Sequence, residues 1–163
     1  MFPADIQTLA RRIIEAAVAR GLGVATAESC TGGLVAGALT AVAGSSAVLD
    51  RGFVTYSNAA KSEMLGVPVD LIETHGAVSE PVARAMAEGA VSRSAATVSV
   101  AVTGIAGPGG GSDEKPVGLV HFAASGPSGL IHAEHRFGDL GREAIRLESV
   151  RVALRLLLDR MGA

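Results

Sequence analysis

Segments with helical periodicity alternate with short β-type segments along the chain, and this alternation constrains the fold more than any other feature of the sequence. Residues 5–20 repeat apolar side chains at helical spacing, with arginines and a glutamate on the opposite side. The other predicted helices have an apolar face or an N-terminal start signal and lie at residues 34–42, 58–65, 79–93 and 142–160. The predicted strands are short and rich in apolar or β-branched residues and lie at residues 24–27, 48–56, 97–103, 117–124 and 130–137. The last two strands flank the turn at residues 125–129 and indicate a hairpin.

This order of elements predicts an α/β fold, a single-domain three-layer sandwich in which a mixed sheet carries helices on both faces. A chain of 163 residues with 48% hydrophobic residues has enough material for one core, so we expect one domain over residues 1–163. Because there are 21 glycines and only 3% aromatic residues, the core is expected to consist of closely packed Ala, Val, Leu and Ile. The apolar first and last helices could pack within the domain or form a dimer face.

Charge and composition argue against several classes of partner. The net charge is -2 and no long basic run occurs, which argues against nucleic acid. The most apolar stretch, residues 34–43, is too short to span a bilayer, and the N-terminus resembles neither a signal peptide nor a transit peptide, so we expect a cytoplasmic protein without membrane association. Cys30 is the only cysteine, which rules out an intrachain disulfide. His132 and His135 would lie on opposite faces of a strand, so they predict no shared metal site.

The segment from Glu28 to Gly33 is the first candidate site, because it joins a strand end to a helix start. Ser29 could act there as a nucleophile while the turn amides, exposed by two glycines, stabilise an oxyanion. The alternative is that Ser29 or Thr31 only caps the helix. Cys30 could attack instead, but no strong histidine partner lies nearby in the sequence, and a buried cysteine usually serves as a small apolar side chain.

Lys61 is the second candidate and falls in the first turn of a helix that Asn58 is predicted to cap. The position is unfavourable for a cation, yet the helix dipole contributes only about 0.3–1 kcal/mol, so burial or a second cation would be needed to bring the amine toward neutrality. A desolvated lysine could activate a serine, as in Ser/Lys dyads. The alternative is an exposed lysine with its amine in water.

The glycine-rich loop from Thr103 to Gly111 follows a strand, as a phosphate-binding loop would, but it fits neither standard nucleotide fingerprint. Its glycines could form an anion-binding nest, or the segment could be a flexible surface loop. Three arginines of the last predicted helix are expected to be solvated or ion-paired, although one could reach a phosphate: Arg142, Arg146 and Arg151.

Four ordered motifs together resemble a known family. They lie at residues 27–33 (Ala-Glu-Ser-Cys-Thr-Gly-Gly), at 52–58 with Lys61 and 65–67, at 75–79 (His-Gly-Ala-Val-Ser), and at 103–108 with 115–118. Over nearly the whole chain the sequence is similar to the C-terminal domain family of CinA, the nicotinamide-nucleotide amidases also called NMN deamidases or PncC.

The resemblance implies an amidase without metal or cofactor that hydrolyses nicotinamide mononucleotide to nicotinate mononucleotide and ammonia in pyridine nucleotide salvage. It implies Ser29 as the nucleophile and makes Lys61 the candidate base, with Tyr56 as an orienting or proton-transferring group. The expected substrate-binding set comprises Thr31, Gly32, Gly33, Asn58, Thr103, Gly104, Ile105, Ala106 and Gly107. Two alternatives stay open, namely a non-catalytic nucleotide-binding module in competence or stress regulation, and an amidase for another small carboxamide.

Two departures from the family pattern matter. The family usually has a compact Phe-x-Gly-Asp-Arg before the terminal helix, whereas residues 137–142 read Phe-Gly-Asp-Leu-Gly-Arg, which displaces the arginine and leaves a role for Arg142 in doubt. Many family members also carry an additional N-terminal domain, and without it this chain is expected to lack that domain's activity. The expected partners are a small nucleotide substrate and a second copy of the chain, with a dimer favoured.

Overall fold

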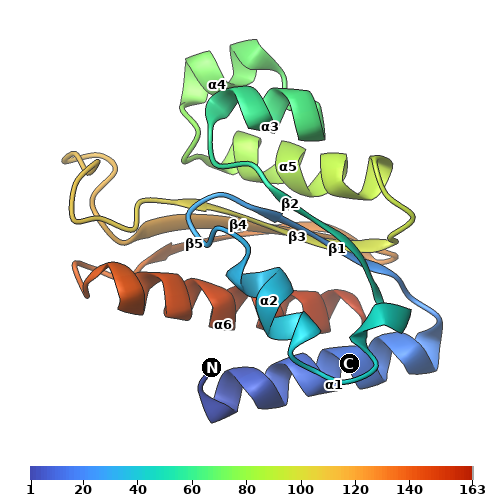
Figure 1. The fold of residues 1–163 in the computed structure, drawn as a ribbon. Coiled ribbons are helices and arrows are strands. Elements are labelled where there is room, and N and C mark those ends of the chain that lie inside the picture. The colour runs from blue at the N-terminus through green and yellow to red at the C-terminus, as the bar shows by residue number, and fades with distance from the viewer. Residues whose placement is uncertain (163) are drawn as a thin grey trace.

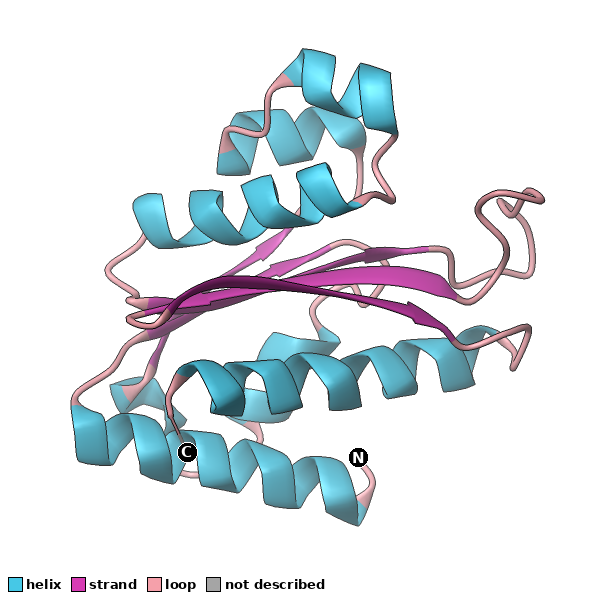
Figure 2. Ribbon diagram, turned by 180° about the vertical axis from the view of Figure 1, so that it is seen from behind, coloured by secondary structure: helices cyan, strands magenta, loops and turns pink. Residues whose placement is uncertain are grey.

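The computed structural model describes residues 1–162 and has one sheet between two groups of helices. The strands are β1 (Val24–Glu28), β2 (Leu49–Val54), β3 (Val98–Gly104), β4 (Leu119–Gly126) and β5 (Gly129–Arg136). The helices are α1 (Ala4–Arg20), α2 (Leu34–Thr40), α3 (Asn58–Leu65), α4 (Val69–His75), α5 (Glu80–Ser92) and α6 (Arg142–Arg160), with a short 3-10 helix η1 (Ser45–Ala47). Helices α3, α4 and α5 cover one face of the sheet, and α1, α2 and α6 lie on the other (Figures 1 and 2). The predicted three-layer α/β sandwich is therefore confirmed.

The sheet is mixed and has the strand order β2-β1-β3-β4-β5. Strand β1 runs parallel to β2 and β3, whereas β4 runs antiparallel to β3 and β5. The predicted hairpin joins β4 to β5, with Gly126 paired to Gly129 at the turn. Because three parallel strands end at the same edge, the segments that follow Glu28, Val54 and Gly104 emerge side by side. This edge positions the candidate site.

Two cores hold the layers together, one on each face of the sheet. Along β3, Val100 and Val102 pack into the core shared with α1, α2 and α6, while Ala101 faces the core under α5. Helix α5 lies so close to α3 that a Cβ at Gly89 would be 2.0 Å from the carbonyl oxygen of Leu65. The expected reliance on small aliphatic side chains is confirmed, because such residues let helices approach the sheet closely.

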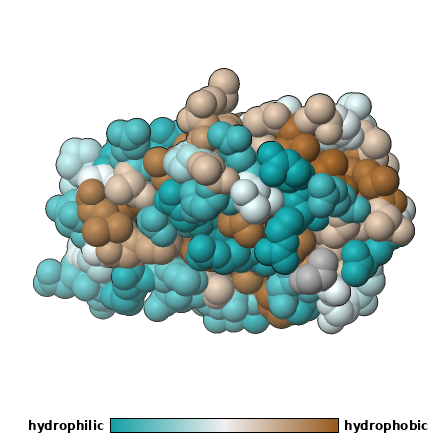
Figure 3. All heavy atoms as spheres, turned by 90° about the horizontal axis from the view of Figure 1, so that it is seen from below, coloured by the Kyte–Doolittle hydropathy of each residue, from teal (hydrophilic) through white to brown (hydrophobic). Residues whose placement is uncertain are grey.

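The apolar faces of the first and last helices pack within the domain. Ile6 and Ile13 of α1 and Leu154 and Leu157 of α6 are fully buried and belong to one core. Seen from the α1 side, the surface is largely hydrophilic, with separate hydrophobic patches (Figure 3). Internal packing, one of the two alternatives raised by the sequence, therefore accounts for these apolar faces. Within residues 1–162, no helix combines the length and apolar character needed to cross a lipid bilayer.

Two local predictions are wrong. Asn58 does not cap α3, because the Oγ of Ser57 accepts a hydrogen bond from the Ala60 amide at 3.0 Å, and Asn58 is the first helical residue. Helix α4, between Pro68 and Gly76, was not predicted, because two helical turns contain too few apolar positions to show a period. Strand β2 and helix α2 also end earlier than predicted.

We expect Gly89→Ala to destabilise the protein by at least about 2 kcal/mol, because the new methyl group would overlap the backbone of Leu65 and force α5 away from α3. Urea denaturation measures this change. Gly109→Ala is the matched control, since nothing lies within 4 Å of a Cβ at that position, and its unfolding free energy should stay within about 0.5 kcal/mol of wild type. Equal stability of the two variants would contradict the close approach of α5 to α3.

Candidate active site

Ser29 and Lys61 meet at the edge where the parallel strands end. Ser29 directly follows β1, and its amide donates a hydrogen bond to the Val102 carbonyl of β3 at 2.9 Å, which extends the pairing by one residue. Helix α3 brings Lys61 from the α3–α5 face of the sheet, so that its Nζ lies 3.1 Å from the Oγ of Ser29. The structure therefore brings together the two residues that the sequence singled out first.

The Lys61 amine is buried among neutral oxygen atoms. The side chain is only 1% exposed, which excludes the alternative of a solvated surface lysine. Besides Ser29, Nζ contacts the carbonyl oxygens of Thr55 at 3.0 Å and Tyr56 at 3.5 Å. Burial lowers the pKa of the amine below its ordinary value, and the opposing electrostatic effect of Cys30 is smaller. The neutral amine is thus favoured by the loss of water around it.

Cys30, the alternative nucleophile, belongs to the hydrophobic core on the α1, α2 and α6 side of the sheet. Burial raises the pKa of its thiol to about 12, and the negative charge of Glu28 acts in the same direction. A thiol with this pKa stays protonated near neutral pH and is a poor nucleophile. The geometry therefore favours Ser29 over Cys30.

Glu28, which sequence reasoning missed, holds the start of α2. Its buried carboxylate accepts hydrogen bonds from the amide of Val35 at 2.8 Å and from the amide of Ala36 at 3.0 Å. The Thr26 hydroxyl donates a third bond at 3.3 Å. The expectation that Ser29 or Thr31 might cap this helix is wrong, because a carboxylate at the end of β1 already occupies its first amides. An acidic residue directly before a turn and a helix start was the available signal.

The turn from Ser29 to Leu34 keeps part of its backbone free. The Gly32 amide donates to the Ser29 carbonyl and the Leu34 amide donates to the Thr31 carbonyl, both at 3.0 Å. Throughout residues 1–162, no protein acceptor is found for the amides of Thr31 and Gly33. Of the amides of the predicted binding residues Thr31, Gly32 and Gly33, that of Gly32 is therefore engaged in closing the turn. Gly32 and Gly33 have φ values of 56° and 104°, which favour glycine.

Two arginines of α6 reach this site, although the sequence suggested that they would be solvated or ion-paired. Arg142 donates to the Tyr56 hydroxyl at 3.0 Å and to the Gly107 carbonyl at 2.6 Å, so it joins two of the predicted site segments despite its displaced position. Arg146 donates to the carbonyls of Cys30 and Thr31. The expectation of a surface ion pair holds for the third arginine, Arg151, which pairs with Asp5 and Glu148.

The Tyr56 side chain is 62% exposed, and its hydroxyl contacts Arg142 instead of Ser29 or Lys61. Its main chain approaches the dyad, because the Tyr56 carbonyl lies 3.5 Å from Nζ. Tyr56 can therefore orient the amine through its backbone and Arg142 through its side chain.

The remaining predicted binding residues form no hydrogen bond with the side chains of Ser29 and Lys61 within residues 1–162. Thr103 is buried and its hydroxyl donates to the Ala77 carbonyl at 2.9 Å. The Ile105 amide and carbonyl both pair with the start of β4, which ties residues 103–105 to the sheet. Gly104 is the last residue of β3, and Ala106 follows the paired Ile105 and is buried. Asn58 lines a hollow of about 450 Å³ between α3 and α4, to which neither Ser29 nor Lys61 contributes.

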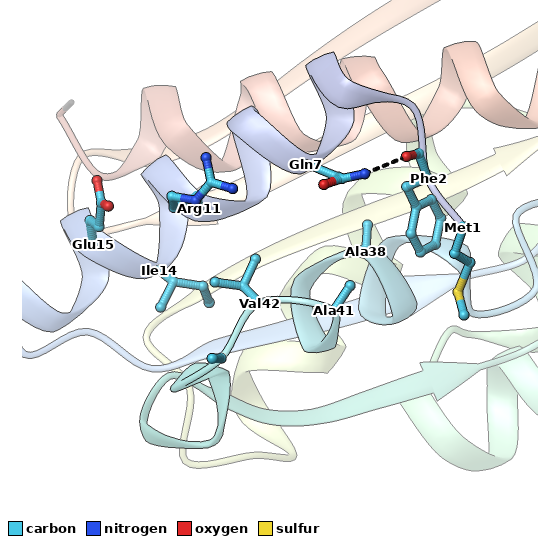
Figure 4. A pocket seen from close by; sticks show the side chains of 10 residues that line it. Met1, Phe2, Gln7, Arg11, Ile14, Glu15, Ala38, Ala41 and Val42 are labelled. Carbon is cyan, nitrogen blue, oxygen red and sulfur yellow. Dashed lines mark hydrogen bonds between the residues drawn. The ribbon is translucent and has the colours of Figure 1, made fainter.

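A larger hollow lies away from the dyad. A space of about 610 Å³ between α1 and α2 is lined by Phe2, Arg11 and Val42 among others, and Gln7 bonds the Phe2 carbonyl at its rim (Figure 4). None of the predicted site residues lines it. The chemistry of the buried amine, more than the volume of a cavity, therefore identifies the candidate site.

No group of three or more His, Cys, Asp or Glu side chains in the described part of the chain is arranged to hold a metal ion. The prediction that His132 and His135 lie on opposite faces of their strand is confirmed. His132 contacts His121 and approaches Glu80 of α5, whereas the ring of His135 packs against Phe122 in the opposite core.

Comparison with known proteins agrees with this architecture. The CinA C-terminal domain family matches residues 6–161. The chain is 54% identical over 157 residues to a CinA-like protein of Synechococcus, covering 96% of this chain and 38% of that protein. It is 58% identical over 126 residues to a putative competence-damage inducible protein of Symbiobacterium thermophilum, covering 77% of this chain and 30% of that protein. The chain thus spans well under half the length of these relatives.

Solved structures match over the full fold. The crystal structure of the competence/damage inducible protein CihA from Agrobacterium tumefaciens has a TM-score of 0.97 and 60% identity, and the match covers 100% of this chain and 99% of that one. A competence-damaged protein (CinA) superfamily protein from Escherichia coli has a TM-score of 0.90 and 39% identity, with coverage of 97% and 92%. The sequence motifs, the mixed five-stranded sheet and these matches agree, and the chain belongs to the CinA C-terminal domain family.

Proposed function

We propose that the chain is an amidohydrolase that converts nicotinamide mononucleotide to nicotinate mononucleotide and ammonia through Ser29. One observation carries the reaction type, namely a buried amine 3.1 Å from a serine hydroxyl, with no carboxylate among its hydrogen-bond partners in residues 1–162. The substrate itself comes from the resemblance of the four sequence motifs to nicotinamide-nucleotide amidases.

The contacts of Nζ suit a general base. A neutral amine has two N–H groups and one lone pair, and the carbonyls of Thr55 and Tyr56 can accept the two hydrogens. The lone pair is then left for the Ser29 hydroxyl, which donates its proton along the 3.1 Å contact. Burial supports this state, because it disfavours the ammonium form.

The proposed reaction has two acyl-transfer steps. Ser29 Oγ attacks the carboxamide carbon while its proton moves to Lys61, and the tetrahedral oxyanion is held by turn amides. The C–N bond then breaks, and the proton on Lys61 passes to the leaving ammonia. Water attacks the acyl-serine ester while Lys61 accepts one of its protons; the bond between the acyl carbon and Ser29 Oγ then breaks, and the proton on Lys61 returns to Oγ. The net change consumes one water and produces one carboxylic acid and one ammonia, which ionise to carboxylate and ammonium.

A binding module for a phosphorylated ligand is the competing hypothesis. Such a module would need the anion-binding groups of the loop and of α6, but it would have no use for a desolvated amine beside a hydroxyl. Burying an amine without a charged partner is costly, so a protein retains it where it serves a function. The amidase is therefore the better explanation of Lys61.

Ser29→Ala is expected to reduce ammonia release from nicotinamide mononucleotide by at least about 1,000-fold, because it removes the attacking oxygen and leaves the rest of the site in place. Ser46→Ala, at an exposed serine of η1, is the matched control and should keep the wild-type rate. A folded Ser29→Ala protein that hydrolyses the substrate at the wild-type rate would exclude the proposal.

The pH dependence should follow the protonation of Lys61. Because the base must be neutral, kcat/KM is expected to rise with pH and level off above the pKa of Lys61, at a pH below the value of about 10.4 for a free lysine. Lys61→Arg stays protonated and should lose at least about 1,000-fold in rate across the whole range. Lys115→Arg, at the other lysine of the chain, should retain the wild-type profile. A flat wild-type profile, or an active Lys61→Arg protein, would rule out the lysine base.

Arg142 is expected to bind the phosphate of the substrate, because its guanidinium lies at the edge of the site between Tyr56 and Gly107. Arg142→Ala should lower kcat/KM for nicotinamide mononucleotide by about 10- to 100-fold, while any hydrolysis of nicotinamide riboside should be nearly unchanged. Arg155→Ala, at an exposed arginine of the same helix, serves as the control. If both substrates lose the same factor, Arg142 does not contact the phosphate.

A further inference from the structure

We propose that Arg146 is a positioning residue that aims the backbone amide of Thr31 at the developing oxyanion. This inference rests on the proposed function, because it names the donor that the amidase reaction needs. Arg146 acts through the main chain of the turn and not through contact with the substrate.

The guanidinium of Arg146 donates hydrogen bonds to two successive carbonyl groups. Its Nε donates to the Cys30 carbonyl at 3.1 Å and its Nη2 donates to the Thr31 carbonyl at 3.2 Å. No carboxylate in residues 1–162 forms a salt bridge with it. The hydrogen bonds of this half-buried side chain therefore all go to the turn, and its planar guanidinium holds two peptide units at the same time.

Because the peptide unit is planar, the hydrogen bond from Arg146 to the Cys30 carbonyl also fixes the direction of the Thr31 amide. The carbonyl of Cys30 and the N–H of Thr31 belong to the same planar trans peptide unit, so they point in opposite directions. Arg146 approaches from α6, on the face of the sheet opposite to α3, which supplies Lys61 (Figure 1). Holding the carbonyl toward α6 therefore turns the N–H toward the side from which Lys61 reaches Ser29.

Of the two peptide units that Arg146 contacts, only the one with the Thr31 amide has a free N–H; the amides of Cys30 and Gly33 are also free within residues 1–162, but they belong to peptide units that Arg146 does not contact. The second peptide unit that Arg146 contacts joins Thr31 to Gly32, and its N–H donates to the Ser29 carbonyl. The amides of Val35 and Ala36 in α2 both donate to Glu28. The Thr31 amide, by contrast, donates to no acceptor within the described chain.

Steady-state kinetics test the inference. Arg146→Ala is expected to lower kcat for nicotinamide mononucleotide by about 100-fold with KM within about threefold of wild type, because a misaligned oxyanion donor weakens the transition state more than the ground state. Arg155→Ala is the matched control from the same helix and should change neither constant. Wild-type kcat in a folded Arg146→Ala protein would overturn the proposal.

Inhibition by 3-pyridylboronic acid separates positioning from a general loss of structure. This probe adds to a serine oxygen to form a tetrahedral adduct, whose oxygen would rest on the oxyanion donors. Its inhibition constant should rise by about the same factor by which kcat falls, while the melting temperature shows that the variant is folded. A lower kcat with unchanged affinity for the boronic acid would overturn the role given to Thr31.

Arg146→Lys covers the case in which the alanine variant does not fold. It keeps the positive charge but replaces the planar fork with a single nitrogen, so kcat should still fall by about tenfold. Wild-type kcat in this variant would count against the inference. Ser29→Ala distinguishes the two proposals: if it still releases ammonia, the amidase proposal fails, whereas an inactive Ser29→Ala with a fully active Arg146→Ala refutes only the role of Arg146.

Discussion

The contact between the Lys61 amine and the Ser29 hydroxyl is the interaction on which the rest of the site depends. An ammonium group loses strong hydration when it is buried, and the oxygen atoms around Nζ are neutral, so its hydrogen bonds offset only part of that loss and no opposite charge offsets the rest. Well-packed aliphatic cores on both faces of the sheet stabilise the fold that carries this buried amine. Local rules of stability are commonly broken at functional sites, and the burial of Lys61 beside Ser29 supports the site proposed above.

The turn that carries Ser29 is held from two directions by opposite charges. Glu28 binds the first amides of α2, and Arg146 binds the carbonyls at the start of the turn. The carboxylate of Glu28 therefore accepts from backbone N–H groups, which carry partial positive charge. The guanidinium of Arg146 donates to backbone C=O groups, which carry partial negative charge. A short turn with two glycines has little rigidity of its own, so these two side chains give it a defined conformation.

Much of the architecture could be predicted because it depends on patterns that are local in the sequence. The alternation of apolar segments predicted the layers, and the motif around Ser29 and the lysine after Asn58 predicted the dyad. Arg146 was not recognised, because its partners Cys30 and Thr31 are more than 110 residues away and a surface helix offers many arginines of similar appearance. The cap of α3 was misplaced by one residue, because Ser57 and Asn58 are both good capping residues and only the backbone conformation decides between them.

Helix α6 follows every other element of the fold in the sequence, yet it supplies both arginines that contact the Ser29 turn and Tyr56. During synthesis, Ser29 and Lys61 are therefore made before the two arginines of α6. A chain in which α6 has not yet packed against the sheet lacks these arginine contacts to Tyr56 and to the Ser29 turn. The conformation of the turn around Ser29 therefore depends on a segment more than 110 residues further along the chain.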